Sequence, residues 1–264
     1  MSRELVRRQW DANTEYWLSK VRTGEDIYRE FMNKPYYLNM VGEVSGLNML
    51  DLACGEGYFS RIFAQSGARV TGIDFSGEMI KAALVEEEKE SLGVNYIQAD
   101  AADLHMLEAG SFDIVCSFMA IMDIKDYKGA IRETSRVLRE NGRFVSIFLH
   151  PCFSWRREKE GKIMVDWERK KQEASLKEYL YLKVYDYFTQ HSYEMTWKNK
   201  ETGESQETTQ FHRTMSDYVN TFAEAGLLIW KMEEPKPISE EVPHRMQKLF
   251  RIPHSILIEA VKKS

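Results

Sequence analysis

The chain has 264 residues, of which 43% are hydrophobic and 29% charged, a composition typical of a globular protein with a buried core. A formal net charge of −5 argues against a nucleic-acid partner, and we expect neither a membrane span nor a secretory leader. Three widely spaced cysteines without a Cys-x-x-Cys pair suit a cytoplasmic protein and give no support for a disulfide framework or a structural zinc site.

Residues 1–41 are expected to form helices that close over a site as a lid. Apolar residues recur at helical spacing from Leu5 to Trp17, and Gly24 interrupts this pattern. Pro35 suits the first turn of a further short helix.

Residues 48–60, with the sequence NMLDLACGEGYFS, predict a strand, a tight turn and the start of a helix. The turn, residues 53–57, carries no bulky side chain near its apex, so its backbone can approach a nucleotide-like ligand closely. Two ligands fit this pattern, a nicotinamide dinucleotide and S-adenosylmethionine.

Strands and helices continue to alternate after this turn. Ser76 is placed to cap one helix, Gly142 follows the end of another, and Thr214 to Asp217 form a capping box that opens a third. The expected strands are residues 49–52, 69–74, 95–98, 112–117, 143–149, 227–232 and 255–261, and the expected helices are 76–91, 127–138 and 214–224. This order predicts an α/β fold with a parallel, doubly wound, Rossmann-like, seven-stranded sheet and a site at the carboxyl edge.

An aromatic insert interrupts the alternation over about sixty residues. Within it, residues 192–198 and 206–212 are expected to pair as a hairpin. No repeat or low-complexity linker sets the insert apart, so we expect one domain throughout and any oligomer contact through the insert. The parts of that domain are a helical lid (1–41), a cofactor-binding core (42–150), an aromatic cap (151–212) and a C-terminal part of the core (213–264).

An acidic residue follows each of the first three expected strands: Asp51, Asp74 and Asp100. Asp74 is placed to grip two ribose hydroxyls, and Asp100 to accept a hydrogen bond from an adenine amine. Asp51 suits the ammonium group of an amino acid and would repel a pyrophosphate. A dinucleotide fold also calls for a third glycine where Ser60 stands. The acids therefore favour S-adenosylmethionine, and the nicotinamide dinucleotide remains the alternative.

Four segments occur in the order typical of one family. They are LDLACGEGYFS as the cofactor loop, VTGIDFSGEMI as the ribose-binding segment, IQADAADL as the adenine-binding segment and FDIVCSFMAIMDI as the fourth-strand motif, followed by AIRETSRVLRENGRFV. With these, the chain resembles the class I S-adenosylmethionine-dependent methyltransferases over about residues 10–150, particularly the branch that acts on small molecules. Ala53 stands where a glycine is more common, a change expected to be harmless.

The resemblance implies a set of cofactor-binding residues. Asp51, Ala53, Gly55 and Gly57 would surround the methionine part, Asp74 would hold the ribose, Phe75 and Met79 would contact adenine, Asp100 and Ala101 would bind its polar edge, and Phe118 would lie near the methyl group. Candidates for closing over the cofactor are Tyr16, Trp17, Tyr28 and Arg29, of which Tyr28 or Arg29 would meet its carboxylate.

The expected reaction is methyl transfer to oxygen or nitrogen of a small, planar or apolar acceptor. The protein would supply alignment and a dry pocket, and an acceptor that loses a proton would need a base. His150, just after the fifth expected strand, and His212, at the return from the insert, are the candidate bases, although each also fits an ordinary loop histidine. Asp123 alone does not suggest a metal site. A binding protein without turnover, or a subunit that modifies protein or RNA, is the alternative from another class.

Overall fold

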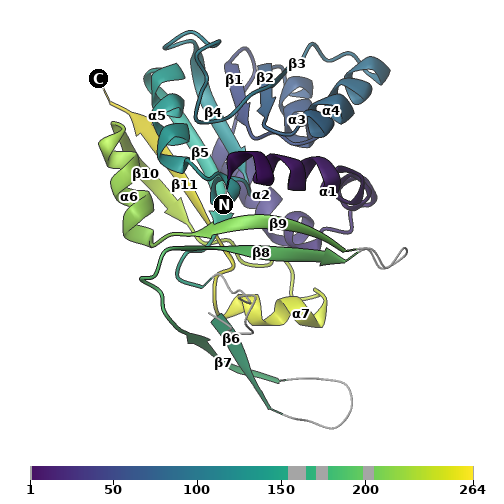
Figure 1. Ribbon diagram of the computed structural model, residues 1–264, viewed down its shortest axis with the longest axis vertical. Coiled ribbons are helices and arrows are strands. Elements are labelled where there is room, and N and C mark those ends of the chain that lie inside the picture. The colour runs from purple at the N-terminus through teal and green to yellow at the C-terminus, as the bar shows by residue number, and fades with distance from the viewer. Residues whose placement is uncertain (1, 154–164, 171–177, 199–204, 264) are drawn as a thin grey trace.

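The computed structural model describes residues 2–153, 165–170, 178–198 and 205–263. Its centre is a seven-stranded sheet (Figure 1) with the strand order β10-β11-β5-β4-β1-β2-β3. The strands are β1 (Asn48–Leu52), β2 (Arg69–Asp74), β3 (Asn95–Gln98), β4 (Phe112–Phe118), β5 (Leu138–Leu149), β10 (Leu227–Glu233) and β11 (Ser255–Lys262). The prediction of a seven-stranded, Rossmann-like sheet is confirmed.

The sheet is mixed, so the prediction that all its strands are parallel was wrong for β11. That strand pairs antiparallel with both β5 and β10. A parallel neighbour would require the chain to cross back to the opposite end of the strands before it paired. The chain between β10 and β11 instead contains only the short helix α7 (His244–Gln247) and the 3₁₀ turn η3 (Lys248–Phe250), and β11 runs back from the edge that β10 has just reached.

Helices cover both faces of the sheet and bury two apolar cores. On one face, α2 (Lys34–Val41), α3 (Tyr58–Gln65) and α4 (Gly77–Lys89) contribute Tyr37, Phe63 and Ile80. On the other, α5 (Tyr127–Val137) and α6 (Met215–Glu224) contribute Ile131 and Phe222. The doubly wound arrangement follows from strands whose alternate side chains are apolar on both faces.

Two predicted caps are present, and one predicted boundary differs. Ser76 accepts a hydrogen bond from the Met79 amide at the start of α4. The helix expected over residues 127–138 ends at Val137, and β5 begins at once, earlier than predicted. The register of β4 against β5 shifts between Phe112 and Ile114. This shift accommodates residues 139–142, which lie between the predicted helix and the predicted strand.

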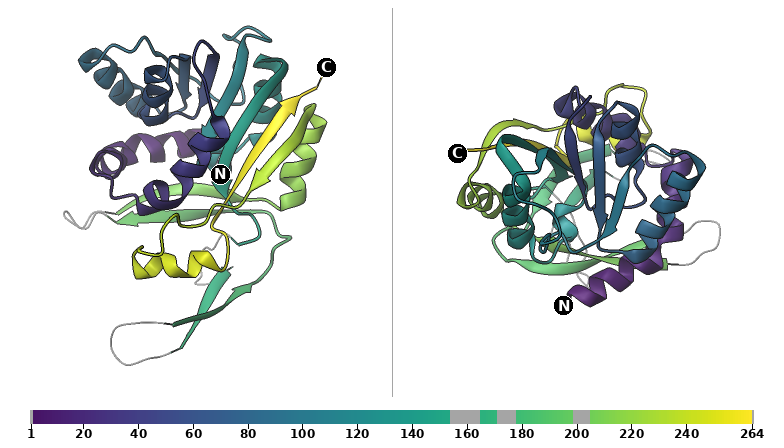
Figure 2. Two further views of the ribbon diagram at one scale, coloured as in Figure 1. Left: turned by 180° about the vertical axis from the view of Figure 1, so that it is seen from behind. Right: turned by 90° about the horizontal axis from the view of Figure 1, so that it is seen from above.

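Helix α1 (Arg3–Thr23) and the hairpin of β8 (His191–Lys198) and β9 (Ser205–His212) extend across the end of the sheet (Figures 1 and 2). Gly24 ends α1 in a left-handed conformation, and a π-helical turn, η1 (Arg29–Asn33), leads into α2. The predicted hairpin is therefore present. A second ribbon, β6 (Val165–Lys170) with β7 (Glu178–Val184), lies farther from the sheet and was not predicted. Among the described residues, no helix combines the length and apolar character needed to cross a membrane.

The capping box at α6 gives a test of local stability. The Thr214 hydroxyl accepts from the Asp217 amide at 3.1 Å, and the Asp217 carboxylate accepts from the Thr214 amide at 2.8 Å. Thr214→Ala should lower the free energy of unfolding by about 1 kcal/mol in urea titrations because one helix-end donor loses its partner. Thr214→Ser keeps the hydroxyl and should stay within error of the parent; an equal loss in both variants would contradict this account.

Candidate functional site

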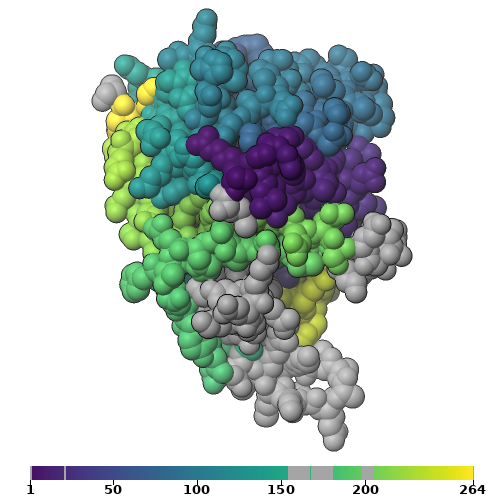
Figure 3. Space-filling model, in the orientation of Figure 1, coloured from purple at the N-terminus to yellow at the C-terminus, as the bar shows by residue number. Residues whose placement is uncertain are grey.

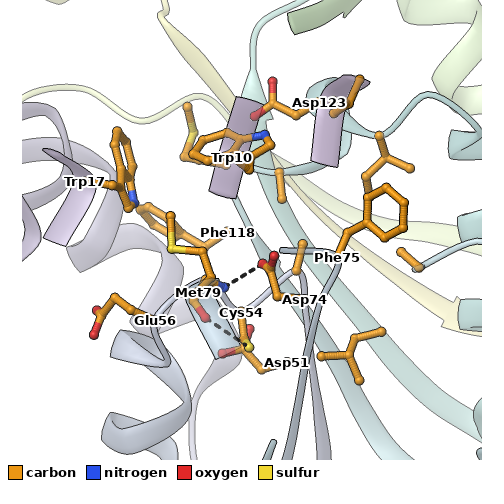
Figure 4. A pocket seen from close by; sticks show the side chains of 18 of the residues that line it. Trp10, Trp17, Asp51, Cys54, Glu56, Asp74, Phe75, Met79, Phe118 and Asp123 are labelled. Atoms are coloured by element: carbon orange, nitrogen blue, oxygen red, sulfur yellow. Dashed lines mark hydrogen bonds between the residues drawn. The ribbon is translucent and has the colours of Figure 1, made fainter. Parts of the chain in front are cut away.

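A cavity of about 170 Å³ opens at the carboxyl ends of β1, β2, β3 and β4, beneath α1 (Figure 4). Its lining comes from segments that are far apart in the sequence. These are Arg3, Val6, Trp10 and Trp17 of α1; Asp26 and Arg29; Asp51 and residues 53–56; Tyr58 and Phe59; residues 73–75 and Met79; residues 99–101; and residues 118–120 and 123–126.

The turn after β1 has an unusual backbone. Ala53, Gly55 and Gly57 all have positive φ, at 58°, 57° and 80°. A Cβ at Gly55 would meet open space, so this position needs glycine for its φ alone and leaves the backbone free to meet a ligand. Ala53 adopts a left-handed conformation that costs an L-residue more than glycine, so the expectation that alanine is harmless there overlooks a local strain.

Gly57 serves packing within the protein. It does not line the cavity, and a Cβ at this position would lie 2.2 Å from the Tyr96 hydroxyl oxygen. A side chain at residue 57 would therefore displace Tyr96 from beneath the turn. The sequence analysis expected Gly57 beside the ligand, whereas in the structure it packs against Tyr96, outside the cavity lining.

Asp74 joins the turn to the end of β2. Its two carboxylate oxygens accept from the amides of Gly55 and Ser76, each at 2.8 Å; Figure 4 shows the bond from Gly55 as a dashed line. Removal of water from this carboxyl raises its pKa to about 6, against the lowering effect of those two hydrogen bonds. Each oxygen retains a lone pair, so Asp74 can accept further hydrogen bonds from a ligand diol.

Asp51 is buried at the floor of the cavity. It accepts a hydrogen bond of 2.6 Å from the Ser60 hydroxyl. Burial, together with the nearby Asp74 carboxylate, raises its pKa to about 7, against the lowering effect of the hydrogen bond from Ser60. A cationic group in the cavity would relieve this cost by stabilising the ionised form.

Asp100 follows β3 at the opposite rim. Its carboxylate accepts from the Ala102 amide at 2.9 Å and from Arg3 of α1 at 3.1 Å. The same guanidinium reaches Asp126 at 2.7 Å. The start of α1 is therefore fixed to the rim by two carboxylates.

Farther along α1, Asp11 accepts from the Ser76 hydroxyl at 2.7 Å and pairs with Arg7. Trp10 and Trp17 pack edge to face with ring centroids 5.9 Å apart, and both line the cavity. Trp17 also contacts Trp197 of β8. In Figure 3, α1 lies on the surface between the half of the protein that carries α3 and α4 and the β9 strand. The helix thus roofs the cavity.

Of the four residues expected to close over the cofactor, Trp17 and Arg29 line the cavity and Tyr16 and Tyr28 do not. Arg29 lines the cavity, is buried, and lies over the Tyr58 ring at 4.3 Å while pairing with Glu30 at 2.7 Å. Tyr28 packs instead against His254, and Tyr16 against Trp197, so neither is part of the lining.

Both histidines lie outside the lining. His150 is buried; its Nε2 lies 2.9 Å from the Glu234 carboxylate, and its Nδ1 accepts from the Cys152 amide. Burial lowers the pKa of His150. His212 places Nε2 2.7 Å from the Tyr187 carbonyl oxygen and therefore donates there. The structure does not bring either ring to the cavity. Each ring instead makes hydrogen bonds to neighbouring loop residues, as expected for an ordinary loop histidine.

Several residues that line the cavity were not predicted from the sequence to belong to the site. Trp10, Asp26 and Asp123 line the cavity, and Asp123 is 7% exposed. The only available signal for Asp123 was its place just after the fourth strand, where it was considered for metal binding alone. In the part of the chain that is described, no three His, Cys, Asp or Glu side chains gather into a metal-binding group.

Comparison with known proteins agrees with this geometry. Residues 50–146 match a family model described as a methyltransferase domain. A demethylmenaquinone methyltransferase of Lactococcus lactis is 35% identical over 116 residues, 42% of this chain and 45% of its own. A ubiquinone biosynthesis O-methyltransferase of Xanthomonas oryzae is 32% identical over 143 residues, 53% of this chain and 55% of its own. The chain thus spans about half the length of these relatives.

A solved structure gives wider coverage. The crystal structure of a putative S-adenosylmethionine-dependent methyltransferase from Listeria monocytogenes aligns with a TM-score of 0.69 and 26% identity, covering 87% of this chain and 97% of that one. The similarity therefore extends beyond the matched domain to most of the fold.

The buried acids predict a specific pH dependence of stability. Because the pKa of Asp51 is raised from its usual 3.8 to about 7, the folded state binds more protons than the unfolded state between these values. The free energy of unfolding should fall as the pH rises from about 4 to about 7, and Asp51→Asn should raise it at pH 8 by about 2 kcal/mol. Urea titrations across this range measure both effects.

Asp103→Asn is the matched control, because it removes one negative charge from an exposed carboxylate that pairs only with His105 among the contacts seen. It should give no gain in stability at pH 8. Equal gains in both variants would mean that net charge, and not the burial of Asp51, sets the pH dependence.

Proposed function

Because this chain belongs to the class I S-adenosylmethionine-dependent methyltransferases, we propose that it transfers a methyl group from S-adenosylmethionine to oxygen or nitrogen of a small-molecule acceptor. The cavity at the carboxyl ends of the central strands is the proposed site. Lid, core, cap and C-terminal part are proposed to act as one domain.

The observation that carries this proposal is the charge of the cavity. Among the described residues, seven carboxyl groups and three cationic side chains line it. Such an excess of acids favours a cofactor with a sulfonium and an ammonium group over a dinucleotide with two phosphates. The open cradle at Gly55 and the spare lone pairs of Asp74 fit the same cofactor.

The proposed contacts follow the order of the strands. Gly55 and Ala53 present backbone to the methionine part, Arg29 meets its carboxylate, and Asp51 stabilises its ammonium group from below. Asp74 accepts hydrogen bonds from both ribose hydroxyls. Phe75, Met79, Asp100 and Ala101 hold the adenine, and Phe118 lies near the methyl group. Gly57, Tyr16 and Tyr28 act indirectly, by shaping the turn and supporting the lid.

When bound, the cofactor supplies a methyl group already activated by the sulfonium charge. The protein therefore mainly aligns the acceptor and excludes water. Trp10, Trp17 and Phe118 provide aromatic walls for a planar acceptor. The Xanthomonas relative is an O-methyltransferase by name, which supports oxygen as the acceptor atom.

The proposed cover of the site is α1 together with the β8–β9 hairpin. The Thr209 hydroxyl of β9 donates to the Gln9 side chain of α1 at 2.7 Å, and Trp197 packs against Trp17 at 5.5 Å. Ligand exchange would require α1 to part from the rim, where Arg3 is held by exposed ion pairs of modest strength.

Calorimetric titration with S-adenosylmethionine, S-adenosylhomocysteine and NAD tests the proposed cofactor. The two sulfur nucleosides should bind and NAD should not. Asp74→Asn should weaken their binding roughly ten- to a hundredfold, because neutralising the carboxylate weakens charged hydrogen bonds to the ribose. Affinity in the parent should also fall as the pH drops below about 6, where Asp74 becomes protonated.

Asp103→Asn, which changes an acid outside the lining, should leave these affinities unchanged. Binding of NAD alone would overturn the proposed function. Equal affinities in Asp74→Asn and in the parent, with unchanged circular dichroism, would remove Asp74 from the site.

A further inference from the structure

Four of the seven acids that line the cavity take no part in the proposed cofactor contacts, and Asp123 is one of them. Asp123 ends the 3₁₀ turn η2 (Ile121–Asp123), which follows β4, and it is 7% exposed. Figure 4 shows its carboxyl group at the Trp10 end of the cavity, on the other side from Asp51 and Glu56. Asp123 therefore lies apart from Asp51, which would hold the ammonium group of the cofactor.

The backbone brings this acid over the cavity through a sharp corner. Met119 follows β4 with φ at +53°, a left-handed conformation that is rare for a large side chain. Its amide donates to the Ile147 carbonyl at 2.8 Å. Such strain is held only where surrounding contacts impose it, and here it turns the chain from the sheet toward the cavity.

A buried arginine fixes the segment that carries Asp123. The Arg213 guanidinium donates to the carbonyls of Ile121 and Ile124, on both sides of Asp123, and to that of Lys125. It also lies over the Tyr127 ring at 4.0 Å. Five donors in a planar group can hold three carbonyls at once, which a lysine cannot reproduce. Arg213 is therefore a positioning residue for Asp123.

The chemistry of this end of the cavity selects among acceptors. An anionic carboxylate would be repelled by Asp123. An amine beside Asp123 would be stabilised as its ammonium ion, which has no lone pair to attack with. A neutral phenol can donate its hydroxyl hydrogen to the carboxylate while its ring lies against Trp10 and Phe118.

We propose that Asp123 binds the hydroxyl group of a planar phenolic acceptor and receives its proton during methyl transfer. The phenol oxygen forms the new bond to the methyl carbon as the methyl–sulfur bond breaks, with that bond's electrons remaining on sulfur. The hydroxyl proton moves to a carboxylate oxygen of Asp123 and from there to water. This inference rests on the proposed function and adds its acceptor class.

The test uses 4-nitrophenol, a planar phenol whose ionisation is visible by absorbance, bound to the complex of the protein with S-adenosylhomocysteine. The nearby charged and titratable groups are Lys125 and Asp126 on the same segment, Arg213 and Tyr218 behind it, and Arg3 on α1. In the parent, the Asp123 carboxylate should raise the pKa of the bound phenol above that of the free phenol. Asp123→Asn should lower that pKa by about one unit, because the anion is no longer repelled.

Asp103→Asn is the charge-matched control and should leave the pKa of the bound phenol as in the parent. Arg213→Lys provides a second variant: it should weaken nitrophenol binding about tenfold while S-adenosylhomocysteine binds as before. Absence of saturable nitrophenol binding to the parent complex, or an unchanged pKa in Asp123→Asn with S-adenosylhomocysteine still bound, would overturn the proposal.

If the proposed function itself were wrong, S-adenosylhomocysteine would not bind to the parent, so that failure can be told apart from the outcomes above.

With a phenolic substrate that turns over, Asp123→Asn should lower kcat about a hundredfold with a smaller change in the KM of the cofactor. A loss of kcat that Asp103→Asn reproduces would assign the effect to net charge and overturn the role of Asp123.

Discussion

The hydrogen bond from the Gly55 amide to the Asp74 carboxylate, 2.8 Å long, is the contact on which the site depends. It ties the turn after β1 to the end of β2, and the turn can make it only because its backbone has positive φ at residues 53, 55 and 57. Tyr96 fills the space behind Gly57 and supports the turn from the sheet. The resulting floor holds two partly desolvated carboxyl groups whose pKa values are raised. These buried acids therefore lower the free energy of unfolding at neutral pH, and a bound cationic ligand would raise it again.

The roof of the cavity has a different physical character from its floor. Exposed ion pairs of Arg3 hold the start of α1 at the rim, whereas a buried side chain, Arg213, holds the segment after β4 through its backbone carbonyls. Exposed pairs are weak and easily exchanged, so the start of α1 is suited to part from the rim. The Arg213 side chain is buried, so the segment that carries Asp123, the proposed acceptor end, stays fixed. A fixed acceptor end beneath the weakly held start of α1 would combine alignment with ligand exchange.

Local sequence patterns predicted much of this architecture. The strand–turn–helix at residues 48–60, the caps at Ser76 and Thr214 and the β8–β9 hairpin all depend on residues close in the chain. The antiparallel direction of β11 was not predicted, because apolar alternation is the same in either direction and only the path of the preceding connection decides. The end of α5 was placed one residue too late, since Leu138 pairs with Phe112 of β4.

The sequence by itself determined the seven strands, the glycine turn and the acids at three strand ends, because period, small residues and strand-end position are local properties. Only the tertiary structure decided which side chains share the cavity. In the sequence, His150 and His212 follow segments that were expected to end near the site. In the structure, His150 instead contacts Glu234 and His212 donates to the Tyr187 carbonyl. Asp123 shows the reverse, because its place over the cavity depends on contacts with Arg213, about ninety residues later in the chain.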